Sequence, residues 1–127
     1  MTQRTARPPT AEGADPRPVD VETMRASARP LLAQRPEFPE DLAPLAALLR
    51  GHLNLMIPEV EAASLGLPKS DIPRACALAC VGEARMRLRI GWPHDSMTVQ
   101  IALVTKLARS VNALCDHWEN LAAKRGR

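Results

Sequence analysis

Apolar residues recur along most of this chain at intervals of three and four residues, the spacing that places them on one face of an α-helix. The pattern is clearest over residues 42–63 and 97–122. No stretch of useful length alternates between apolar and polar residues with the two-residue period of a β-strand. The first stripe consists of Leu42, Leu45, Leu49, Leu53, Met56, Val60 and Ala63, and the second of Met97, Ile101, Val104, Ala108, Val111, Cys115, Trp118 and Ala122. We therefore expect an all-α fold.

Capping residues and prolines set the limits of the first two predicted helices. Asp20 can cap a first helix, which Pro30 should kink or split because proline has no amide hydrogen. Residues 38–41 open the second helix, with a bend expected before Pro58. Residues 66–68, Gly-Leu-Pro, should end it with a left-handed glycine cap.

Two further helices follow in the second half of the chain. Ser70 or Asp71 caps the third helix, which runs to about Ile90, and the fourth starts after Asp95 or Ser96. Because the connections are short, neighbouring helices should be antiparallel. The prediction is an antiparallel bundle of about four helices.

Three segments make up the predicted domain organisation. Residues 1–18 contain four prolines among polar residues, so this segment should be a disordered tail, with a docking peptide as the alternative. Residues 19–123 should form a single helical bundle domain, and residues 124–127 a basic C-terminal tail.

Four polar residues are predicted to point into the bundle, where leucine would be easier to bury. A helical wheel places His52, Glu83 and Asn112 within or beside the apolar arcs of three helices, and Arg87 lies four residues after Glu83. A buried carboxylate needs a partner, so we expect one interhelical hydrogen-bond network to satisfy all four.

This polar core cluster has two interpretations. A satisfied network can fix the register of a bundle without any chemistry of its own. Alternatively, the same residues line a ligand or catalytic pocket, in which burial tunes Glu83 and His52 serves as acid or base. A third outcome is that Pro30 and Pro58 rotate the helical segments that follow them, so that the helical wheel assigns residues to the wrong faces.

The third helix is apolar on more than one face. Its core face is expected to hold Ile72, Cys76, Ala79, Met86 and Ile90, while Val81 and Leu88 lie on the far side and Ala75, Ala79 and Gly82 form a strip of small residues. Such a helix is either central in the bundle or shared with a second subunit. On the fourth helix, Lys106, Ser110 and His117 should face solvent.

Metal and cofactor chemistry are not expected. Cys76 and Cys80 share one helical face, but Cys115 and His117 are two residues apart and point in nearly opposite directions, which argues against zinc. No Glu-x-x-His pair suits a di-iron site, and no phosphate-binding or nucleophile motif occurs. We therefore predict no metal and no cofactor.

Composition and charge limit the partners and the cellular compartment that we expect. The net charge of +3 over 127 residues is mild for a nucleic-acid binder, and no apolar run is long enough for a membrane span. The N-terminus lacks the apolar segment of a secretion signal, and the three cysteines suggest reduced thiols, so the protein is expected to be cytoplasmic.

Residues 49–61, 71–88 and 107–121 resemble a small actinobacterial helical family of unknown function, whose members carry the label "natural product biosynthesis protein". The similarity spans roughly residues 24–121, and Pro30 departs from what resembles a continuous first helix. The resemblance implies a compact helical protein associated with secondary metabolism, and carries over no catalytic residue, cofactor or substrate.

These observations favour an accessory or regulatory protein over an enzyme. Such a protein would act through protein–protein contacts, and its partner could be a second copy of itself. One alternative is a small-molecule binder or enzyme that uses the polar pocket. A second is a DNA-associated regulator, although nucleic acid is the partner that the mild charge supports least.

Overall fold

The computed structural model describes residues 19–125, which form four α-helices joined by loops. They are α1 (Val21–Ala28), α2 (Ala43–Leu65), α3 (Ile72–Leu88) and α4 (Met97–Arg125), and a short 3₁₀ helix, η1 (Arg29–Leu32), follows α1. This stretch holds no strand, so the all-α prediction is confirmed. The predicted disordered tail, residues 1–18, lies outside the described residues.

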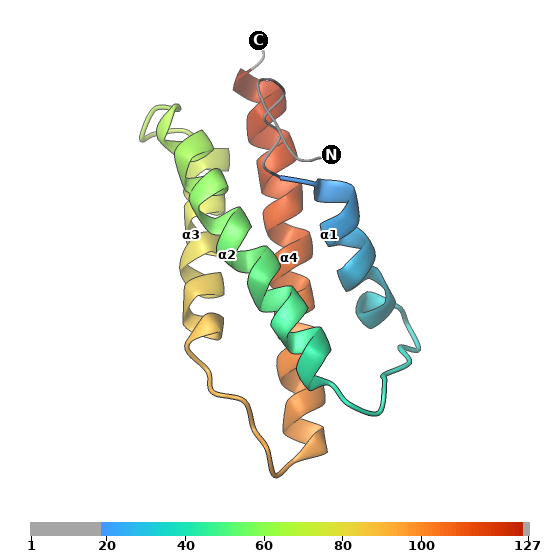
Figure 1. Cartoon of the computed structure of the whole chain (residues 1–127). Coiled ribbons are helices and arrows are strands. Elements are labelled where there is room, and N and C mark those ends of the chain that lie inside the picture. Colours follow the sequence, from blue (N-terminus) through green and yellow to red (C-terminus); the bar gives the residue numbers. More distant parts are fainter. Residues whose placement is uncertain (1–18, 126–127) are drawn as a thin grey trace, which may run out of the picture.

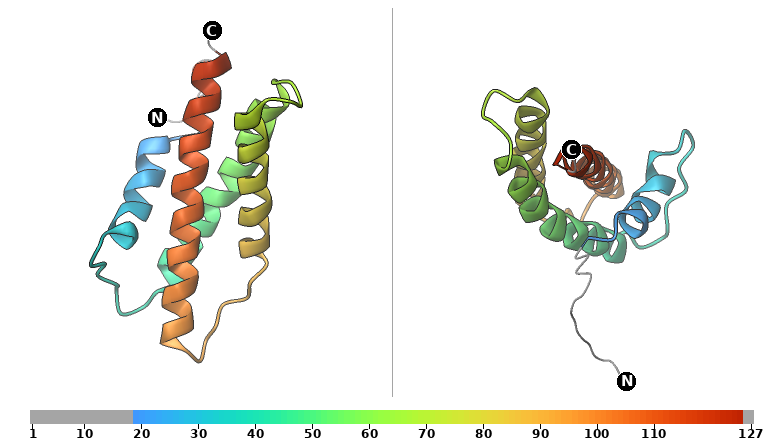
Figure 2. Two further views of the ribbon diagram at one scale, coloured as in Figure 1. Left: turned by 180° about the vertical axis from the view of Figure 1, so that it is seen from behind. Right: turned by 90° about the horizontal axis from the view of Figure 1, so that it is seen from above.

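Helix α4 is the centre of the bundle, and successive helices run in opposite directions (Figure 1). It contacts α1, α2 and α3, whereas α1 and α3 make no contact across residues 19–125. The end-on view in Figure 2 shows why: α1 and α3 lie on opposite sides of α4, and α2 passes between them. One side of both α3 and α4 therefore has no helix packed against it.

The helix starts follow the predicted caps. The Asp20 carboxylate accepts a hydrogen bond from the amide of Thr23 at 3.1 Å, and Asp71 accepts one from the amide of Arg74 at 2.9 Å. Ser96 Oγ accepts from the amide of Val99 at 3.2 Å, so all three polar caps satisfy amides that their helices leave free. Pro30 lies where α1 gives way to η1, as expected of a residue that cannot continue the α-helical ladder.

Several helix ends differ from the prediction. Helix α2 begins at Ala43 rather than at residues 38–41, and it continues through Pro58; the bend before Pro58 stays a prediction. Gly66 has φ −77°, in the right-handed region, so the expected left-handed cap is wrong; the turn is closed instead by the Leu67 amide, which donates to the Ser64 carbonyl at 3.0 Å. Helix α4 extends through Arg125, into the segment expected to be a basic tail.

The hydrophobic core lies where α2 and α4 face each other. The two apolar stripes supply fewer than half of its buried residues among residues 19–125, because on α4 the predicted stripe missed Leu103, Leu107, Leu114 and Leu121, which are buried as well. All members of the α2 stripe are buried except the half-buried Leu45; on α4, Val104, Ala108, Val111 and Cys115 are fully buried, and Met97 is exposed. Burying a side chain such as Leu53 or Val60 contributes about 1.5–3 kcal/mol relative to leaving it in water. No helix among residues 19–125 is both long and apolar enough to cross a membrane.

Helix α3 faces the opposite way from the prediction. Its buried residues are Ala77, Val81 and Ala84, whereas the expected core residues Ile72, Cys76, Ala79, Met86 and Ile90 are all exposed. Helix axes approach more closely when the side chains between them are small. The alanines at positions 77 and 84 let α3 lie close to both α2 and α4.

Candidate functional site

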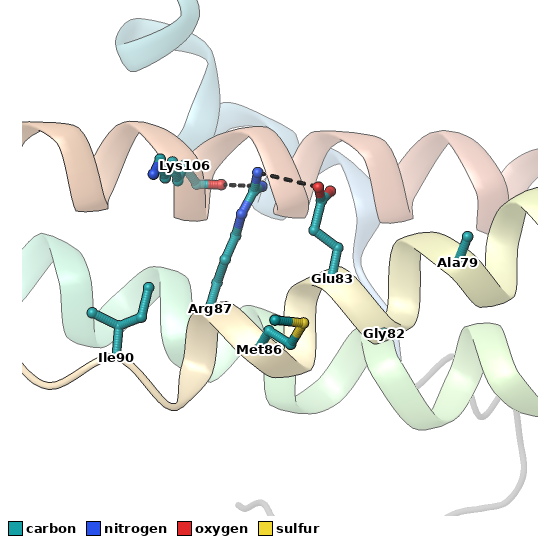
Figure 3. A pocket seen from close by; sticks show the side chains of 7 residues that line it. All are labelled: Ala79, Gly82, Glu83, Met86, Arg87, Ile90 and Lys106. Carbon is teal, nitrogen blue, oxygen red and sulfur yellow. Dashed lines mark hydrogen bonds and ion pairs between the residues drawn. The ribbon is translucent and has the colours of Figure 1, made fainter.

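A surface groove runs between α3 and α4 on the side that no other helix covers (Figure 3). It has a volume of about 650 Å³. Six residues of α3 and its C-terminal end and one of α4 line it: Ala79, Gly82, Glu83, Met86, Arg87, Ile90 and Lys106. We call it the α3–α4 groove; two of the four predicted site residues, Glu83 and Arg87, lie in it.

Arg87 joins the two walls of this groove. Its Nη1 donates to Ser110 Oγ at 2.7 Å and to the Lys106 carbonyl at 3.0 Å, both on α4. The side chain of Arg87 is 20% exposed, and Ser110 is 2% exposed. The expectation that Ser110 faces solvent is therefore wrong: α3 covers it, and Arg87 satisfies its hydroxyl.

Glu83 is not buried, which corrects the central expectation about the polar cluster. Its side chain is 60% exposed, and its carboxylate lies 3.5 Å from Arg87 Nη2, one turn along the helix. Figure 3 shows both side chains reaching from α3 toward α4 at the open side of the groove. Because α3 presents its other face to the core, Glu83 lies in water, where an ion pair contributes little.

His52 lies elsewhere, between α2 and α1. Its Nδ1 is 3.1 Å from Ser27 Oγ, which in turn donates its single proton to the Met24 carbonyl at 2.7 Å. The contact between Ser27 and His52 joins α1 to α2. Burial lowers the pKa of His52 below its usual 6.5, so the ring is neutral at pH 7.

Asn112 belongs to a third cluster, centred on a residue that the sequence reasoning missed. Arg25 of α1 donates to Asn112 Oδ1 at 3.1 Å and pairs with Asp116 at 2.8 Å and Glu119 at 2.5 Å. Burial by itself lowers the pKa of Arg25, but the two carboxylates outweigh it and raise the pKa. A usable signal was Asn112, Asp116 and Glu119 at intervals of four and three residues, a polar face that needs a cation.

The four predicted residues therefore do not form one network: His52, the Glu83–Arg87 pair and Asn112 lie in three separate places. Each pairing holds two helices together or two turns of one helix. Within residues 19–125, no three His, Cys, Asp or Glu side chains are close enough to hold a metal ion.

Two of the three cysteines, Cys80 and Cys115, have thiols with a raised pKa. Cys76 is exposed, Cys80 is half-buried and Cys115 is buried. Burial raises the pKa of the Cys115 thiol to about 11, and burial together with the nearby Glu83 raises that of Cys80. A nucleophilic cysteine needs a lowered pKa, so these two thiols do not suit that role.

The exposed apolar residues of α3 extend beyond the groove. Ile72 is 74% exposed, Met86 67% and Ile90 44%, and Ala75, Cys76, Ala79 and Gly82 between them are exposed as well. We call these seven residues the α3 outer face. A single exposed apolar side chain is ordinary, whereas these residues share one side of α3 and its C-terminal end, where the exposed carboxylate of Glu83 also lies.

Comparison with known proteins gives no activity for this chain. No curated protein and no solved structure matches the sequence. The model of a family of unknown function, DUF6415, matches residues 22–123, which cover all four helices but for the first residue of α1 and the last two of α4. The chain thus belongs to the DUF6415 family of unknown function.

Proposed function

We propose that this protein is an accessory or regulatory protein that acts through protein–protein contacts made by the α3 outer face. One observation carries the proposal: Ile72, Met86 and Ile90 leave much of their surface in water on the same side of one helix. Covering such a face removes apolar area from water, at about 25 cal/mol per Å². Nothing comparable supports catalysis, because the acid–base candidates His52 and Glu83 lie in different parts of the fold.

The biological setting of the proposal comes from sequence resemblance. Residues 49–61, 71–88 and 107–121 resemble the actinobacterial family labelled "natural product biosynthesis protein". We accordingly place the protein in the cytoplasm, in association with secondary metabolism. In this proposal the protein binds another protein of the pathway and regulates its activity, and does not itself convert a metabolite.

The test uses a charge placed on the proposed face in the native host. The variant Met86→Glu should fold, since the residue is exposed, but should lose both the proteins that co-purify with the wild type and its normal profile of secondary metabolites. Leu55→Glu is the matched control, because Leu55 is a similarly exposed apolar residue on α2, at 52%. Equal behaviour of the two variants would refute the proposal.

A second candidate function is small-molecule binding in the α3–α4 groove. Its volume of about 650 Å³ falls within the range of ligand pockets, about 300–1,000 Å³, and Arg87 and Lys106 offer positive charge beside apolar Met86 and Ile90. The variant Glu83→Gln tests ligand binding separately from stability, because the Glu83 side chain is exposed and contributes little to the stability of the fold. Loss of a co-purifying small molecule, measured by native mass spectrometry with the fold intact, would favour a ligand site.

A further inference from the structure

We propose that the α3–α4 groove binds a tripeptide with apolar side chains and free ends, its ammonium group at Glu83 and its carboxylate at Lys106. This inference rests on the second candidate function, since it names the ligand class of the same groove. The order of charges along the groove carries it. Figure 3 shows the Glu83 carboxylate and the Lys106 ammonium group on opposite sides of the Arg87 guanidinium group.

The two outer charges of the groove are available to a ligand. Glu83 is exposed, and its carboxylate lies 3.5 Å from Arg87 Nη2, a separation longer than an N–H···O hydrogen bond. Lys106 is exposed as well, and within residues 19–125 its ammonium group has no hydrogen-bond or ion-pair partner. A ligand with a positive and a negative end can therefore pair with both residues while the bonds of Arg87 to α4 stay in place.

Arg87 offers a fixed donor between these two charges. Its Nη1 donates to Ser110 Oγ at 2.7 Å and to the Lys106 carbonyl at 3.0 Å, so the guanidinium group is positioned before a ligand arrives. Among the described residues, its Nη2 has only the long contact with Glu83, which leaves N–H groups free to donate. A peptide places carbonyl oxygens, which accept such bonds, between its ammonium and carboxylate ends.

The length of the groove matches three residues of peptide. Figure 3 shows Ile90 at the Lys106 end of the groove, and Ile90 follows Glu83 by seven residues, or about 10 Å along the axis of α3. An extended chain of three residues also spans about 10 Å. A free amino acid is too short to reach both charges, because its ammonium and carboxylate groups share one carbon atom.

The apolar wall of the groove suits the side chains of such a peptide. Met86 is 67% exposed and Ile90 is 44% exposed, and they lie one helical turn apart, about 6 Å along the axis. In an extended peptide the first and third side chains point to the same side, about 7 Å apart. These two side chains can therefore lie against Met86 and Ile90, which explains why we expect them to be apolar.

Titration of the full chain with the peptide Leu-Ala-Leu, followed by amide NMR, tests the proposal. Shifts should be confined to residues 79–90 and the surroundings of Lys106, with a dissociation constant between about 0.1 mM and about 10 mM, because the charges concerned are exposed to water. N-acetyl-Leu-Ala-Leu and Leu-Ala-Leu-amide are the control ligands, because each lacks one end charge. Each should bind about threefold more weakly.

Single substitutions assign each end of the peptide to its residue. Glu83→Gln should weaken binding of Leu-Ala-Leu about threefold and leave the affinity for the acetylated peptide unchanged. Lys106→Gln should do the same with the amidated peptide. Glu22→Gln is the matched control, because Glu22 is an exposed carboxylate of α1, outside the groove. Circular dichroism checks that every variant is folded.

Four results would each overturn the proposal. They are no shifts at about 10 mM peptide, shifts spread over surfaces outside the groove, equal affinity for the free and the blocked peptides, and equal effects of Glu83→Gln and Glu22→Gln.

These outcomes are distinguishable from failure of the proposed functions. If the peptide does not bind while Glu83→Gln loses another co-purifying small molecule, the groove holds a different class of ligand and this inference alone fails. If the peptide binds while Met86→Glu keeps all its co-purifying proteins, this inference stands and the role through protein–protein contacts falls.

Discussion

Replacing Arg25 by alanine should loosen α1 from α4, because this side chain is the main polar link between them. The Arg25 side chain is 18% exposed, whereas its partners Asp116 and Glu119 are 55% and 52% exposed and can be hydrated after its loss. Each of these ion pairs is therefore worth about 0.5–1 kcal/mol. The bond to the partly buried Asn112 adds about 1 kcal/mol.

The expected loss for Arg25→Ala is about 2 kcal/mol in the free energy of unfolding, which for a domain of this size lowers Tm by about 8 °C. Urea unfolding followed by circular dichroism at 222 nm measures it. Arg29→Ala is the control: Arg29 is exposed on η1, and its replacement should change stability by less than about 0.5 kcal/mol. If the two variants are equally stable, the ion pairs seen here do not hold α1 in place.

Three further predictions concern single side chains. Because burial lowers the pKa of His52 in the folded protein, the unfolded chain binds a proton at higher pH than the folded chain does. The free energy of unfolding should therefore fall as the pH drops below 6.5, and should not fall above that pH. His52→Gln should abolish this part of the pH dependence, as measured by urea unfolding at pH 5–7. Cys115 should resist alkylation by iodoacetamide at pH 8 in dilute protein while exposed Cys76 reacts; mass spectrometry of peptides showing equal labelling would contradict the burial. Leu53→Ala should cost about 2–5 kcal/mol, since Leu53 is fully buried, and a smaller loss in urea unfolding would mean that the core collapses around the cavity.

The candidate site was predictable in part. The wheel brought Glu83 and Arg87 together, as local geometry requires of residues four apart on a helix. It failed for contacts between helices, because the partners of Asn112 and His52 are Arg25 and Ser27 of α1, and the periodicity of one helix does not say which residues of another lie against it. Which distant residues meet depends on how the helices are packed.

The amino-acid sequence alone determines that this chain is helical, where most of its helices begin, and which face of α2 enters the core. Each of these is a local property: a carboxylate such as Asp71 caps the amides that follow it, and a single apolar stripe leaves a helix one face to bury. Tertiary structure alone decided the orientation of α3. Its two faces are both apolar, so the pattern does not choose between them. In the folded chain Ala77, Val81 and Ala84 are buried and α3 packs against both α2 and α4, an outcome that depends on residues of all three helices, and it leaves Ile72 and Met86 on the surface.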